Sequence, residues 1–181
     1  MSLDVMGPVM LEMAVSFAKK TGASVEAELG CMGKRETGSG SEKEGKGPEK
    51  IYTDPKQAKV FAEATGIDAL ACSFGTTHGV YLSRPMLDFS VVENVRKLAG
   101  VPVVMHGGSG VSEEDYRKAI KAGVRKINYY TYMSMAGGSG VRTQIQKAEN
   151  ESPVMYHDIV SWGIQAMKQN CREAMKIFAY K

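Results

Sequence analysis

The chain has 181 residues, of which 43% are hydrophobic and 24% are charged, and its formal net charge is +3. This length is sufficient for one hydrophobic core and favours a single domain over residues 1–181. The net charge is small and lysines alternate with glutamates, which does not indicate nucleic-acid binding. No apolar run approaches the roughly 18 residues of a membrane span.

The three cysteines are far apart and odd in number: Cys31, Cys72 and Cys171. This usage is typical of reduced thiols in a cytosolic protein. The N-terminus does not show the basic region and apolar core of a secretory signal. We therefore expect a cytoplasmic protein that binds neither a membrane nor nucleic acid.

The first predicted elements are a helix and a strand. Residues 9–20 carry apolar side chains at helical spacing, and Gly22 ends this helix. Residues 24–30 then predict a strand that contains Glu26 and Glu28. Because these two glutamates are two positions apart, both face the same side of the strand.

The order of helix, glycine and strand then recurs three times. The later predicted strands span residues 67–74, 101–106 and 124–129. Alternating helices and strands predict an α/β fold with parallel strands joined by right-handed crossovers. Four such units fit either half of an eight-stranded β/α barrel or a small open sheet. In both folds, ligands bind at the C-terminal ends of the strands.

Two stretches interrupt this order, and a long helix closes the chain. Residues 33–50 are almost wholly polar or glycine, which predicts a mobile loop that serves as a lid or is an inert insertion. Residues 136–140 are rich in glycine and predict a flexible segment. Residues 155–178 predict an amphipathic C-terminal helix whose apolar stripe serves packing.

Polar residues stand at the end of each predicted strand. Glu28 ends the first, His78 follows the second, His106 ends the third, and Asn128 and Thr131 lie at the fourth. Two histidines and a carboxylate can form a zinc site with an open coordination position. A histidine at a strand end can also be a structural hydrogen-bonding group, and the residues alone leave both interpretations open.

A glycine-rich turn at residues 107–110 lies between His106 and a helix expected to begin at Ser112. Backbone N–H groups in such a turn, next to a helix N-terminus, can hold a phosphate. A plain tight turn is the alternative. His157, near the start of the last helix, is interpreted as an exposed helix residue.

Four motifs together resemble one known family. They are VEAELG at residues 25–30, YTDP at 52–55, GTTHGVY at 75–81 and HGGSGV at 106–111. Their order and spacing resemble the class II, metal-dependent ketose-bisphosphate aldolases, closely over residues 10–135 and loosely over the last helix. The resemblance implies a TIM (β/α)8 barrel, of which this chain contains about four C-terminal β/α units.

The resemblance also implies a reaction. It is the metal-dependent aldol cleavage or condensation of a ketose 1,6-bisphosphate, such as the cleavage of fructose 1,6-bisphosphate to dihydroxyacetone phosphate and glyceraldehyde 3-phosphate in glycolysis and gluconeogenesis. Fructose and tagatose bisphosphates both remain open as substrates. The implied cofactors are zinc and a monovalent cation, Na⁺ or K⁺, and the implied assembly is a homo-oligomer, either a dimer or a tetramer.

Individual residues match functional positions of the family. The metal positions are His78, His106 and Glu28. The substrate-binding positions are Gly79, Gly107, Gly108, Ser109, Asn128 and Thr131. Glu36, in the polar loop, matches a mobile catalytic glutamate that moves the proton at carbon 3 of the triose.

The chain also departs from the family pattern. In the family, four strands precede the one that carries Glu28, and they supply a further zinc histidine and a general-acid aspartate. Asp4 is not accompanied by a histidine and does not match this pair. Tyr129, Tyr130 and Tyr132 stand where the family has small or acidic polar residues.

Three interpretations follow. The chain represents a class II aldolase through its C-terminal half, or it is a non-catalytic half-barrel that binds a sugar phosphate or a protein partner. The third is a phosphate-binding barrel enzyme with other chemistry, whose activity would persist in the presence of a chelator.

Overall fold

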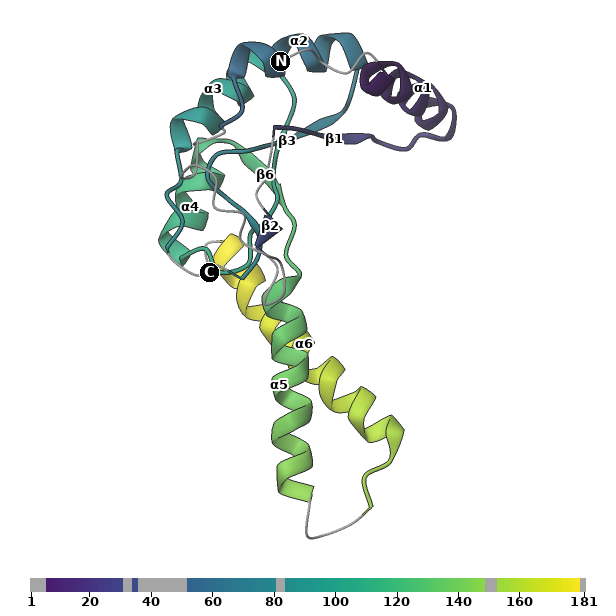
Figure 1. Ribbon diagram of the computed structural model, residues 1–181, viewed down its shortest axis with the longest axis vertical. Coiled ribbons are helices and arrows are strands. Elements are labelled where there is room, and N and C mark those ends of the chain that lie inside the picture. Colours follow the sequence, from purple (N-terminus) through teal and green to yellow (C-terminus); the bar gives the residue numbers. More distant parts are fainter. Residues whose placement is uncertain (1–5, 31–33, 36–51, 81–83, 149–152, 180–181) are drawn as a thin grey trace, which may run out of the picture. The chain divides into compact units, whose positions relative to one another are not determined.

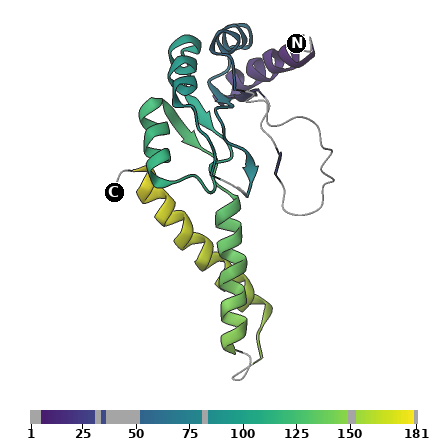
Figure 2. The same cartoon turned by 60° about the vertical axis from the view of Figure 1, so that its left-hand side comes forward.

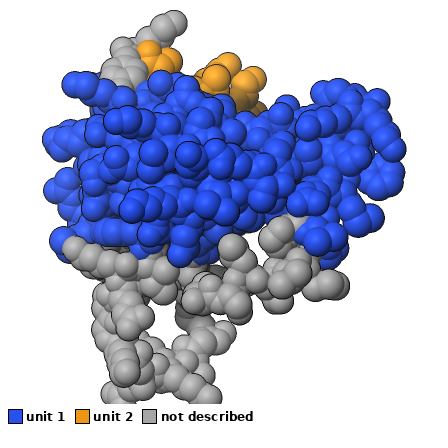
Figure 3. All heavy atoms as spheres, turned by 90° about the horizontal axis from the view of Figure 1, so that it is seen from above, with its two compact units in different colours: residues 1–128 blue, residues 129–181 orange. Residues whose placement is uncertain are grey.

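The computed structural model describes residues 6–30, 34–35, 52–80, 84–148 and 153–179 (Figure 1). The expected loop over residues 33–50 lies outside this description except for residues 34–35. The chain forms two compact units, Met1–Asn128 and Tyr129–Lys181 (Figure 3). Among the described helices, none combines the length and apolar character needed to cross a membrane.

The first unit alternates helices with strands. Its helices are α1 (Met6–Thr21), α2 (Pro55–Thr65), α3 (Phe89–Ala99) and α4 (Glu113–Ala122). Its strands are β1 (Glu26–Leu29), β2 (Lys34–Arg35), β3 (Ala69–Cys72), β4 (His78–Gly79), β5 (Val103–Met105) and β6 (Val124–Ile127). Helix boundaries follow local chemistry: Asp54 caps α2 by accepting bonds from the N–H groups of Lys56 and Gln57, and Gly66 ends the helix at φ 66°.

Four strands form a parallel sheet in the order β1-β3-β5-β6, and β2 pairs separately with β4. The helices α1 to α4 follow one another around one side of this sheet (Figures 1 and 2). The middle strands β3 and β5 are the most deeply buried, and Leu70, Val103 and Val104 have no exposed surface. The α/β fold with parallel strands, expected from the alternating sequence pattern, is confirmed.

A β-bulge changes the register between β5 and β6. Val103 is opposite Val124, but the next residue, Val104, is opposite Lys126, so Arg125 is an extra residue in β6. Lys126 therefore stands in the same row across the sheet as Val104, Ala71 and Glu28. Bulges commonly redirect a side chain next to a functional site, and this one places Lys126 on the face that carries Glu28.

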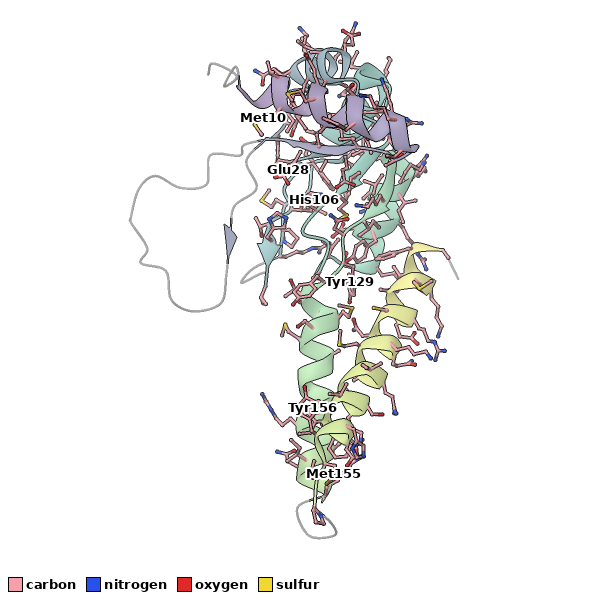
Figure 4. The ribbon with its side chains drawn as sticks, turned by 90° about the vertical axis from the view of Figure 1, so that its right-hand side faces the viewer. Met10, Glu28, His106, Tyr129, Met155 and Tyr156 are labelled. Carbon is pink, nitrogen blue, oxygen red and sulfur yellow. The ribbon has the colours of Figure 1, made fainter. Side chains whose placement is uncertain are left out.

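The second unit consists of two helices, α5 (Thr131–Ala148) and α6 (Tyr156–Phe178), which lie side by side and run in opposite directions (Figures 1 and 4). The expectation of a flexible segment at residues 136–140 is wrong, because these residues lie inside α5. A Cβ atom at Gly140 would lie 2.5 Å from the Cβ of Ala166, and one at Gly137 would lie 2.8 Å from Cγ of Met167. The glycines therefore allow the two helices to pack closely.

Candidate active site

Thr53 fixes the C-terminal ends of β1 and β3 relative to each other. Its buried hydroxyl donates to the carbonyl oxygen of Leu29 at 2.7 Å and accepts from the N–H of Ser73 at 2.8 Å. Its own backbone N–H donates to the Ser73 carbonyl at 2.8 Å. These bonds hold the strand that carries Glu28 beside the segment that leads to His78.

Glu28, His78 and His106 form a cluster at this edge of the sheet. One ligand atom of each residue lies within 4.8 Å of the others. Glu28 Oε2 is 2.8 Å from His106 Nδ1, and the centroids of the His78 and His106 rings are 5.8 Å apart. Figure 4 shows Glu28 and His106 next to each other. The structure thus brings together the three residues that were expected to bind a metal.

The donor set of this cluster fits zinc. Zinc prefers imidazole nitrogen and carboxylate oxygen ligands, and three protein ligands leave a fourth position open for a substrate or water. Glu28 and His78 are exposed and His106 is half-buried. A small molecule can therefore reach the cluster from solvent while His106 is held by its surroundings.

Two further residues contact the cluster. Glu26 Oε1 lies 2.8 Å from His106 Nε2, and Glu26 Oε2 accepts a bond of 2.6 Å from Lys126 Nζ. Lys126 Nζ also donates to Oδ1 of Asn128 at 2.8 Å. Burial raises the pKa of the Glu26 carboxyl, but the hydrogen bonds and charges of Lys126 and His106 outweigh burial and lower this pKa below its ordinary value.

Sequence reasoning noted that Glu26 shares a side with Glu28 but assigned it no role, and it missed Lys126. Simple alternation along β6 would place Arg125, not Lys126, on the face of Glu28. Only the bulge reverses this placement, and we find no signal in the sequence that marks it.

The glycine-rich turn lies against the loop that follows β3. Gly107 has φ 63°, and a Cβ atom there would lie 2.3 Å from the carbonyl oxygen of Thr77. The Tyr116 hydroxyl of α4 donates to the carbonyl oxygen of Gly108. Ser109 is buried, and Ser112 caps α4 by accepting a bond from the N–H of Asp115. The turn therefore leads directly into a helix N-terminus, where an anion is stabilised.

The other predicted site residues are distributed as follows. Gly79 follows His78 in β4, at φ 93°. Asn128 ends the first unit and contacts Lys126, whereas Thr131 begins α5 in the second unit. Glu36 lies outside the described residues. His157 is exposed, as expected, with a side chain that is 79% accessible.

Tyr129, one of the tyrosines that depart from the family pattern, is engaged inside the second unit. Its hydroxyl donates to Oδ1 of Asn170 at 2.9 Å, and its ring packs edge-on against Phe178. Burial raises the pKa of Tyr129, and the hydrogen bond to Asn170 opposes this effect. These contacts give Tyr129 a packing role within the helical pair.

A profile of the family described as fructose-bisphosphate aldolase class-II matches residues 10–181. The chain belongs to this family. Among solved structures, it is similar to the YdjI aldolase from Escherichia coli K12, with 34% identity and a TM-score of 0.74, over 94% of this chain and 55% of that one. It is also similar to fructose-bisphosphate aldolase (Fba) from Campylobacter jejuni, with 25% identity and a TM-score of 0.71, over 95% of this chain and 56% of that one.

The chain therefore spans about half the length of these aldolase structures. Its parallel α/β sheet corresponds to part of their TIM barrel. The predicted family and the predicted partial-barrel fold are both confirmed.

Proposed function

We propose that this chain takes part in the metal-dependent aldol cleavage and condensation of a ketose 1,6-bisphosphate, with fructose 1,6-bisphosphate as the first substrate to test. One observation carries this proposal: Glu28, His78 and His106 converge within 4.8 Å beside a glycine-rich turn in a chain of the class II aldolase family. The conversion to dihydroxyacetone phosphate and glyceraldehyde 3-phosphate would belong to cytoplasmic glycolysis and gluconeogenesis.

The cluster would hold zinc, the metal that this family generally uses. When bound, zinc supplies Lewis-acid polarisation of a substrate oxygen. His78 and His106 would provide neutral imidazole nitrogens and Glu28 a carboxylate oxygen. The contact between Glu28 and His106 holds two of the three donors in place before a metal binds.

The glycine-rich turn would hold the phosphate of the three-carbon product. Gly79, Gly107, Gly108 and Ser109 would present backbone N–H groups and a hydroxyl to it, with Na⁺ or K⁺ beside the phosphate. Tyr116 and the close approach to Thr77 fix the shape of this turn. A phosphate held there fixes the position of the reacting carbons and lowers the entropic cost of the reaction.

Asn128 and Thr131 would contact the substrate after the last strand, and Glu36 would move the proton at carbon 3. A glutamate within hydrogen-bonding distance of that carbon can act as a general base. Closure of the polar loop would bring it there and exclude water. We propose a homo-oligomer, a dimer or a tetramer, as the working assembly.

Cleavage of fructose 1,6-bisphosphate tests this function. The assay compares the wild-type chain with His106→Ala, with and without a chelator, and uses His157→Ala as the control because His157 is exposed and outside the cluster. Any turnover is expected to be lost with the chelator and in His106→Ala, and to persist in His157→Ala. Turnover that survives both treatments would instead support an enzyme with other chemistry.

A further inference from the structure

The carboxylate of Glu26 lies between the imidazole of His106 and the ammonium group of Lys126. Its two oxygens have different partners: Oε1 lies 2.8 Å from His106 Nε2, and Oε2 lies 2.6 Å from Lys126 Nζ. Rotating this carboxylate would disturb both contacts. Charge-assisted hydrogen bonds of this kind are short and define orientation well.

The two nitrogens of His106 face different residues. Nδ1 faces Glu28, a member of the metal cluster, and Nε2 faces Glu26. A histidine that binds a metal through one nitrogen usually donates its other N–H to a carboxylate or a carbonyl, which fixes the tautomer and the ring orientation. Glu26 occupies the position of that second partner.

Lys126 reaches Glu26 only because of the bulge in β6. Without Arg125 as an extra residue, Lys126 would be opposite Met105 and would face the other side of the sheet. The Lys126 ammonium is held in turn by Asn128 Oδ1 at 2.8 Å. The fold thus includes a local irregularity whose consequence is to place a cation on the outer oxygen of Glu26.

We propose that Glu26, held by Lys126, is a positioning residue that keeps the proton of His106 on Nε2 and directs Nδ1 toward the metal. This proposal rests on the metal site of the proposed function. Glu26 touches neither the metal nor the substrate in this arrangement, and it acts through His106.

Titration of the 181-residue chain with Zn²⁺ against a chromophoric chelator tests the proposal. The variants are Glu26→Gln, which keeps the size of the side chain, and Lys126→Met, which keeps most of its stem. Glu114→Gln and Lys118→Met are matched controls, since these residues form an exposed ion pair of 2.6 Å on α4. We expect Glu26→Gln to weaken Zn²⁺ binding by about 10- to 100-fold, the usual effect of losing such a partner.

Lys126→Met should weaken binding less than Glu26→Gln, Lys126→Arg should restore most of the loss, and both controls should bind like the wild type. The visible absorption spectrum of bound Co²⁺ provides a second readout, because it reports ligand geometry. It should change in Glu26→Gln but not in Glu114→Gln. A merely structural role would lower the thermal midpoint of the metal-free chain and leave the Co²⁺ spectrum of the folded protein unchanged.

Two contrary results are distinguishable. Wild-type affinity and an unchanged Co²⁺ spectrum in Glu26→Gln would overturn the positioning role and leave the proposed function intact. Zn²⁺ binding that is as strong in His106→Ala as in the wild type would overturn the metal site itself, and the positioning role with it.

Discussion

Glu28 and His106 are 78 positions apart in the chain, yet Oε2 of Glu28 lies 2.8 Å from Nδ1 of His106. Their strands are not neighbours, because β3 lies between β1 and β5. In the row across the sheet, Ala71 of β3 stands between Glu28 and Val104. Its methyl group is small, so the Glu28 side chain can extend over β3 to reach His106.

The first prediction concerns Gly107. Gly107→Ala should lower the free energy of unfolding of the chain by about 2–4 kcal/mol, because the new Cβ meets the Thr77 backbone in addition to the strain of a positive φ. Urea unfolding measures this change. Gly22→Ala is the control, since Gly22 has φ 71° and open space around it, and about 1 kcal/mol is expected there. Equal losses in the two variants would contradict the close contact with Thr77.

The second prediction concerns the packing of α5 against α6. An alanine usually stabilises a helix relative to glycine by about 0.5–1 kcal/mol. Gly138→Ala should follow this rule because its surroundings are open, whereas Gly140→Ala should destabilise the helical pair because the new Cβ would lie 2.5 Å from that of Ala166. Thermal unfolding followed by far-UV circular dichroism compares the two variants. A gain in stability at both positions would show that the helices do not pack closely at Gly140.

How much the sequence could predict depends on whether an interaction is local. The helix–glycine–strand order predicted parallel strands, and parallel strands place their C-terminal ends at one edge, so the convergence of Glu28, His78 and His106 was foreseeable. The position of Lys126 was not, because it depends on how β6 pairs with β5. Gly140 was misinterpreted for a similar reason: a glycine-rich run is flexible or closely packed according to what lies against it.

The third prediction concerns the two described cysteines. Burial raises the pKa of the Cys72 thiol from 9.0 to about 12, whereas Cys171 is only half-buried. Since the thiolate is the reactive form, iodoacetamide at about pH 8 should modify Cys171 in the folded protein and Cys72 only after unfolding in urea. Peptide mass mapping distinguishes the sites. Rapid modification of Cys72 in the folded protein would contradict its burial.

The same thiol affects stability at high pH. Because the folded protein holds the Cys72 proton more tightly than the unfolded chain does, this group contributes stability that is fully present below pH 9.0 and is lost as the pH rises toward about 12. The alkaline loss of stability should therefore be shallower in Cys72→Ala than in the wild type. Urea midpoints measured across this pH range give the comparison.

The most direct test of the account is the zinc content of the purified chain after dialysis against a low concentration of Zn²⁺, measured for the wild type, His78→Ala, His106→Ala and His157→Ala. The account predicts one chelator-removable zinc per chain in the wild type and in His157→Ala, and a large loss in the other two variants. Zinc retained at the wild-type level in both His78→Ala and His106→Ala would contradict a metal site formed by Glu28, His78 and His106.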